Sequence, residues 1–151
     1  MRTDSPQPNP ESTAAIVLLH TLPDGSSHFD WMIERPGIAE EHRLMTFRVD
    51  ERVDHWEPGQ LFHGEQLGDH RAHYLQHQGD IGGGRGVVER VVGGRCTRFE
   101  CSEAGGELVF EVLWGFDGGV GGEDVRRYSG VRDSGVVWRF TCEVIGLASG
   151  G

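Results

Sequence analysis

The chain has 151 residues and a formal net charge of −10, and all 14 of its basic residues are arginines. Its length fits one domain with its own core. Its negative charge excludes a protein that coats nucleic acid without sequence preference, because the strength of such binding grows with the number of phosphates neutralised by basic side chains. Binding of a single nucleic-acid end stays open, since a metal and a few arginine forks can hold phosphate. The 24 glycines, set between short apolar runs, predict many strands joined by tight turns.

The two ends of the chain predict no regular element. Residues 1–13 are polar with three prolines and no apolar signal region, so we expect a disordered arm at 1–13, a domain at 14–146 and a flexible tail at 147–151. No stretch is apolar and long enough to span a bilayer. The three cysteines lack zinc-finger spacing, which indicates reduced thiols in a cytoplasmic protein. Cys96 and Cys101 would face opposite sides of one continuous strand.

The first two strands are predicted at Ala14–His20 and His28–Glu34, joined as a hairpin by a turn that contains Pro-Asp-Gly. Alternation along the second strand places His28, Asp30, Met32 and Glu34 on one face and Phe29, Trp31 and Ile33 on the other. The second strand therefore has one side that carries candidate functional residues, called here its chemical side. Glu34 continues that side, and an ordinary exposed carboxylate is an equally good interpretation of it.

Candidate metal ligands meet at the turn of this hairpin. His28 and Asp30 lie two positions apart and share a face, and His20 ends the preceding strand, so the three side chains can converge on one ion. Two imidazoles and a carboxylate suit Mn, Zn or Fe(II) better than Ca. The alternative is a solvated strand face, because His-x-Asp also occurs by chance.

The next segments carry weaker signals. A short helix is expected around Pro36–His42, a third strand at Leu44–Val49, and irregular structure over Asp50–Gly68. Further strands are expected over five short apolar runs, which are Val87–Val92, Thr97–Cys101, Leu108–Trp114, Val125–Tyr128 and Val136–Val144. The recurring turns predict an all-β fold, a β-barrel of about eight mostly antiparallel strands with one or two short helices.

A second group of candidate catalytic and phosphate-binding residues follows the third strand. His70 is a candidate to contact phosphate or to act as general acid, with Asp69 orienting it and Tyr74 close by; the alternative is a polar loop with exposed histidines. Farther on, Gly82–Gly86 could let backbone amides and Arg85 approach a phosphate. This loop lacks the Lys-Ser/Thr of a P-loop, so nucleotide binding is not predicted, and a simple tight turn is the alternative.

The order of these motifs resembles the 3′-phosphoesterase module of bacterial DNA ligase D. That family has a His, a turn, and a His-aromatic-Asp strand that ends in Glu, which correspond here to His20 and to His28–Glu34. It then has Asp-His, three residues and Tyr, followed by a Gly-containing loop before a strand; here these are Asp69–Tyr74 and Ile81–Gly86. The resemblance covers about Ala14–Val144.

The resemblance implies a compact β-barrel with a crescent-shaped groove. It also implies manganese-dependent removal of 3′-phosphates and 3′-terminal ribonucleotides from DNA primer ends. Zn, Co or Fe are alternative metals for the same ligands. The implied partners are a DNA 3′ end and a separate ligase or repair polymerase. The implied metal ligands are His20, His28 and Asp30, and His70 would contact the scissile phosphate with Asp69 and Tyr74 beside it.

The chain departs from the family at its phosphate-binding positions. Met32 stands where the family has Arg, the third strand ends without a Lys, and Leu61–Gly68 holds no Arg. Arg48, Arg71 or Arg85 could take over these roles. Two other functions stay open at this point. One is a module that binds a nucleic-acid end or a repair complex without catalysis. The other is a small metal-dependent oxygenase with His28, Asp30 and a distal His70 as ligands.

Overall fold

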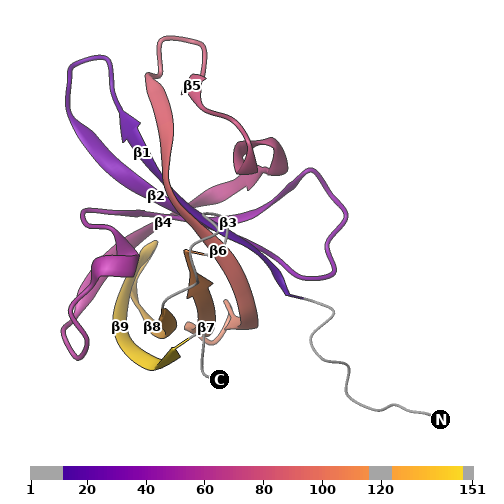
Figure 1. Cartoon of the computed structure of the whole chain (residues 1–151), viewed down its shortest axis with the longest axis vertical. Helices are drawn as coiled ribbons and strands as arrows, with labels where there is room; N and C mark the ends of the chain where they lie inside the picture. The colour runs from indigo at the N-terminus through magenta and orange to yellow at the C-terminus, as the bar shows by residue number, and fades with distance from the viewer. Residues whose placement is uncertain (1–11, 116–123, 148–151) are drawn as a thin grey trace.

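The computed structural model describes residues 12–115 and 124–147, and over these ranges it shows nine strands in one antiparallel sheet. Eight strands close into a barrel in the order β1-β2-β3-β4-β9-β8-β7-β6, because β6 pairs back with β1, and the short β5 adds to β6 (Figure 1). The strands are β1 Thr13–Thr21, β2 Ser27–Glu34, β3 His42–Val49, β4 Phe62–Arg71, β5 Gly79–Asp80, β6 Val87–Ser102, β7 Glu107–Trp114, β8 Asp124–Ser134 and β9 Val137–Leu147.

The predicted all-β barrel is confirmed, but its helical parts differ from expectation. The described residues contain two 3-10 turns, η1 at Val53–His55 and η2 at Ala72–Leu75, and no α-helix. The short helix expected around Pro36–His42 is wrong. Gly37 has a φ of 74° there, which a helix does not allow. The segment instead forms the loop of the hairpin that connects β2 to β3. Residues 1–11 and 148–151, most of the predicted arm and tail, lie outside the described residues.

Among the strands that differ from their predicted extent, β4 and β6 share a cause, which is a local break in alternation, whereas β8 simply extends beyond the predicted Val125–Tyr128. β4 begins inside the segment expected to be irregular, and its pairing with β3 shifts register. β6 unites two predicted strands and has a bulge between Cys96 and Arg98. That extra residue restores parity, so Cys96 and Cys101 both pack against the core instead of facing opposite sides.

The barrel interior is filled by odd-numbered side chains of β1–β3 and by the inner faces of the other strands. Trp31 lies at its centre and is fully buried. Its ring contacts five other aromatic rings at centroid distances of 4.8–5.7 Å, from Phe47, Trp56, Phe110, Tyr128 and Phe140. Such an aromatic cluster buries a large apolar area and anchors β2 in one register.

A second apolar cluster covers the outer face of the same strands. Its strand members are even-numbered, such as Leu18 and Met32, and they pack against Tyr74 and Leu75 of η2 and against Ile81 of the following loop. Strands β1–β3 are therefore buried on both faces. The segment 72–86 lies over their outer face, and the chemical side predicted for β2 faces this segment. No helix in the described ranges is long and apolar enough to cross a membrane.

Candidate metal centre

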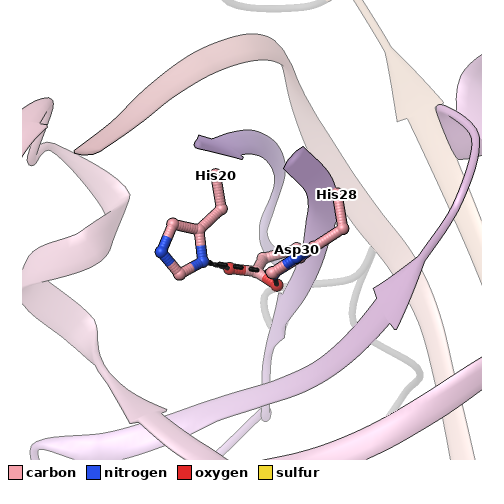
Figure 2. Close-up of side chains that lie close together, drawn as sticks. All are labelled: His20, His28 and Asp30. Atoms are coloured by element: carbon pink, nitrogen blue, oxygen red, sulfur yellow. Dashed lines mark hydrogen bonds and ion pairs between the residues drawn. The ribbon is translucent and has the colours of Figure 1, made fainter. Parts of the chain in front are cut away.

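Three predicted ligands meet at the turn end of the β1–β2 hairpin. His20 and His28 are directly opposite each other in the antiparallel pairing, and Asp30 lies two residues farther along β2. His20 Nδ1 is 3.1 Å from His28 Nε2 and 3.4 Å from Asp30 Oδ2, and His28 Nε2 is 3.2 Å from Asp30 Oδ1. Figure 2 shows the three side chains pointing toward one another. Strand parity and a short turn are enough to produce this arrangement.

The donor atoms fit a single divalent cation. Imidazole and carboxylate ligands bind such ions at about 2.1 Å, which separates neighbouring ligand atoms by about 3.0 Å at right angles and about 3.4 Å at tetrahedral angles. The three observed separations, 3.1–3.4 Å, lie within this range. Among the described residues these three form the His, Cys or carboxylate group close enough to share an ion. Two imidazoles and one carboxylate also form the donor set of many transition-metal sites.

Burial of the carboxylate supports the same assignment. Asp30 is only 4 % exposed, and its Oδ1 is buried without a hydrogen bond. A buried carboxylate is costly unless a cation or several donors compensate it. Burial also lowers the pKa of His28, and nearby Arg48 and His20 lower it further, although Asp30 acts in the opposite direction. The neutral imidazole that results is the form that ligates a metal.

A cavity of about 300 Å³ opens beside the donor set. Its other polar lining comes from Arg48, His70, Tyr74 and Arg85, and Asp30 is the one carboxylate among the lining residues. Two arginines therefore face this cavity in a chain whose net charge is −10, which favours an anionic ligand at this place. The rest of the lining is mainly apolar and consists of Leu22, Pro23, Met32, Leu67, Ile81, Gly84 and Val88.

Arg48 neighbours the candidate metal ligands in the sheet. It pairs with Asp30 across β2 and β3, so both side chains lie on the same face. Its side chain is 45 % exposed, and Nη1 is 3.9 Å from the Glu65 carboxylate, which is a loose ion pair. Exposure and weak pairing leave this guanidinium able to turn toward an anion in the cavity.

His70 reaches the cavity because of a bulge in β4. Thr46 pairs with Leu67 and Leu44 with His70, so β4 contains one more residue than β3 over this stretch. Leu67 and His70 consequently both line the cavity. His70 Nδ1 donates a hydrogen bond of 2.8 Å to the Gly68 carbonyl, which leaves Nε2 as the nitrogen for a ligand.

The same bulge turns Asp69 away from the cavity. Its carboxylate accepts hydrogen bonds from Arg35 Nε at 2.6 Å and from Arg35 Nη2 at 3.1 Å. Asp69 is thus held by Arg35 away from the cavity, and the carbonyl of Gly68, not Asp69, orients the imidazole of His70. Tyr74 does line the cavity, and its ring lies 5.5 Å from that of His70.

Two further residues expected at the site lie elsewhere. Glu34 shares the β2 face with Asp30 but stands at its far end, where it accepts hydrogen bonds from Arg43 Nε at 2.8 Å and from the Ala14 amide at 3.2 Å. Arg71 is exposed at the end of β4 and does not line the cavity.

The sequence did not predict two features of the site: the apolar lining of the cavity, called here the apolar wall, and the Arg35–Asp69 ion pair, called here the clamp. Met32 could have been assigned to the wall from its parity with Asp30, but Ile81 and Val88 come from segments whose position depends on the closed barrel. Arg35 had no signal, since 34 residues separate it from Asp69.

No protein-family model matches the chain, and a comparison with curated proteins likewise gives no match. Function is therefore inferred from the chemistry of the cavity and from the order of its motifs.

Proposed function

We propose that the chain is a divalent-metal-dependent phosphoesterase that processes DNA 3′ ends, removing a 3′-phosphate or a 3′-terminal ribonucleotide, with Mn²⁺ as the best-suited metal. One observation carries the proposal: the His20, His28 and Asp30 donor set shares a cavity with Arg48 and His70. Metal ligands beside an arginine and a histidine are the components needed to polarise and cleave a phosphate ester. The motif order that resembles the ligase D module supports the same chemistry.

The metal would be held by His20 Nδ1, His28 Nε2 and the Asp30 carboxylate. When bound, a divalent cation offsets charge on the phosphate and lowers the pKa of the attacking water. Because all three residues line the cavity, an ion held by them would be accessible to a substrate bound there.

The other cavity residues divide the remaining tasks. Arg48 holds non-bridging phosphate oxygens through charge-assisted hydrogen bonds. His70, oriented by the Gly68 carbonyl, donates a proton from Nε2 to the leaving oxygen when it is in the imidazolium form. Tyr74 supports the His70 ring, and the apolar wall packs against the terminal sugar and limits access of water. The acidic remainder of the surface restricts contact to the end of a DNA strand.

A 3′-end assay tests this function directly. A 5′-labelled primer-template with either a 3′-phosphate or one 3′-ribonucleotide is incubated with Mn²⁺ and wild type, His28→Ala or His55→Ala. His55 is 65 % exposed on its side chain and lies outside the cavity, so it is the matched control. We expect product from wild type and His55→Ala alone. Unchanged turnover in His28→Ala would refute the proposal.

A second candidate is a module that binds a 3′ end without cleaving it. The side-chain bonds of Arg85 favour this candidate. Its guanidinium donates to the carbonyls of Ile81 and Gly82 at 2.6 and 3.1 Å, so these donors are not directed at a phosphate in the cavity. With Arg71 outside the cavity, Arg48 is left as the main phosphate ligand among the predicted arginines. Mn²⁺ binding by wild type with no turnover on either substrate would select this function.

The donor set also resembles that of iron-dependent oxygenases, which use two histidines and a carboxylate. The version with His70 as third ligand receives no support, because His20 lies with His28 and Asp30 while His70 bonds to Gly68. Oxygen consumption dependent on Fe(II) and an oxoacid would favour an oxygenase; we expect none.

A further inference from the structure

The glycine-rich loop between β5 and β6 is held in a defined shape by its own bonds. Gly82, Gly83, Gly84 and Gly86 all have positive φ, from 63° to 104°, which only glycine adopts readily. The Arg85 guanidinium folds back onto two carbonyls of this loop, and the Ile81 amide donates to the Gly86 carbonyl at 3.0 Å. The loop is therefore a compact unit, and the Arg85 side chain stabilises it from within.

One carbonyl of this loop contacts a metal ligand. His20 Nε2 lies 2.9 Å from the carbonyl oxygen of Arg85. A carbonyl can only accept, so the imidazole hydrogen must be on Nε2. The lone pair is then on Nδ1, the atom that faces His28 and Asp30. A hydrogen bond to the far nitrogen of a metal-binding histidine fixes both its tautomer and its ring orientation.

Gly86 determines how closely the loop approaches β1. A Cβ added at this position would lie 2.1 Å from the Thr21 carbonyl oxygen and 3.1 Å from Leu22 Cα, both backbone atoms that cannot rotate away. Thr21 directly follows His20, so any side chain at position 86 would push the loop off the strand end that carries the ligand. At Gly82, in contrast, an added Cβ meets nothing within 4 Å.

We propose that the loop 81–86 is a positioning element for the metal centre: Gly86 seats the loop on the end of β1, and the Arg85 carbonyl then holds His20 with Nδ1 available for the ion. The inference rests on the metal site of the proposed function, and it assigns to Arg85 a role through its backbone. It also explains the glycines of this loop without nucleotide binding.

Gly86→Ala and Gly82→Ala form a matched pair for the test. Both replace a glycine of positive φ in the same loop, so both introduce backbone strain, but only Gly86→Ala creates the clash with Thr21. Calorimetric titration with Mn²⁺ alone should show binding about 10–100-fold weaker in Gly86→Ala and within about threefold of wild type in Gly82→Ala. Equal loss in both variants, or unchanged affinity in a folded Gly86→Ala, would overturn the proposal.

A measurement on the metal-free wild type makes the test independent of how the variants fold. Imidazole ¹⁵N NMR should show His20 as the Nε2–H tautomer, and Gly86→Ala should lose this preference. The Nδ1–H tautomer in wild type would overturn the proposal. These readouts use no DNA, so absence of phosphoesterase activity would count against the proposed function and leave the positioning role standing.

Discussion

The clamp between Arg35 and Asp69 gives the sharpest test of which residues act in the chemistry. The pair is bidentate at 2.6 and 3.1 Å, and the two side chains are 20 % and 26 % exposed. A fully buried charged hydrogen bond contributes up to about 3 kcal/mol and an exposed pair less than about 1. The partial exposure places this pair between them, so Arg35→Met and Asp69→Asn should each lower the free energy of unfolding by about 1–2 kcal/mol.

For a domain of this length, a loss of 1 kcal/mol lowers Tm by roughly 2–4 °C, so each variant should melt about 2–8 °C below wild type. The double variant should melt close to Arg35→Met, because that substitution already removes the pair with Asp69. Asp69→Asn alone leaves the longer contact of Arg35 Nη2 with Glu103 at 3.4 Å. Thermal and urea unfolding of the four proteins, followed by circular dichroism, measures this coupling.

The same variants separate a structural from a chemical role for Asp69. If Asp69 acts only by fixing the β4 bulge that presents His70, then both substitutions should lower kcat by similar factors, below about tenfold. Turnover of the 3′-phosphate substrate is the assay. A loss above about 100-fold in Asp69→Asn with normal turnover in Arg35→Met would refute the reasoning, because it would show that the carboxylate itself takes part in the reaction.

Three further outcomes are expected. Arg48→Ala should lower kcat/KM on a 3′-phosphate about 10–100-fold, the loss expected for one charge-assisted hydrogen bond, and Arg48→Lys should recover part of it; equal activity of all three proteins would exclude Arg48 from phosphate binding. Mn²⁺ at 100 times its Kd should stabilise the apo protein by about 2.7 kcal/mol in calorimetric melts, and EDTA or His28→Ala should abolish that shift. Partial burial acts to raise the pKa of Glu111, but hydrogen bonds from Arg98 and Arg127 outweigh it and hold the pKa below the usual 4.5. This stabilisation is present above pH 4.5 and is lost as pH falls through the lowered pKa. In Glu111→Gln, the free energy of unfolding, measured by urea denaturation, should therefore fall less steeply as pH is lowered below 4.5.

The convergence of the three candidate metal ligands could be predicted from the sequence because their geometry is local. Alternation on one strand and a short turn bring His20, His28 and Asp30 together whatever the rest of the barrel does. The barrel itself followed from apolar runs separated by turns. For the same reason, β1–β3 were placed within one or two residues of their observed bounds.

What could not be predicted depends on bulges and on distant pairing. One extra residue in β4 places His70 toward the cavity and Asp69 toward Arg35. The alternation of apolar and polar residues does not show where in a strand such a bulge occurs. The bulge in β6 misled the assignment of Cys101 in the same way. The contact of His20 with Arg85 joins residues 65 positions apart, and closure of the barrel produces it.

The two buried faces of β2 make the fold and the site inseparable. Asp30 faces the candidate metal centre and its neighbour Trp31 fills the centre of the aromatic core. A slip of one residue in strand pairing would exchange them, placing a carboxylate among aromatic rings and an indole among the ligands. Misregistered chains therefore lose the ion site and the core together. If the proposed ion binds only the correct pairing, metal supplied to the refolding chain would favour the register in which the barrel closes.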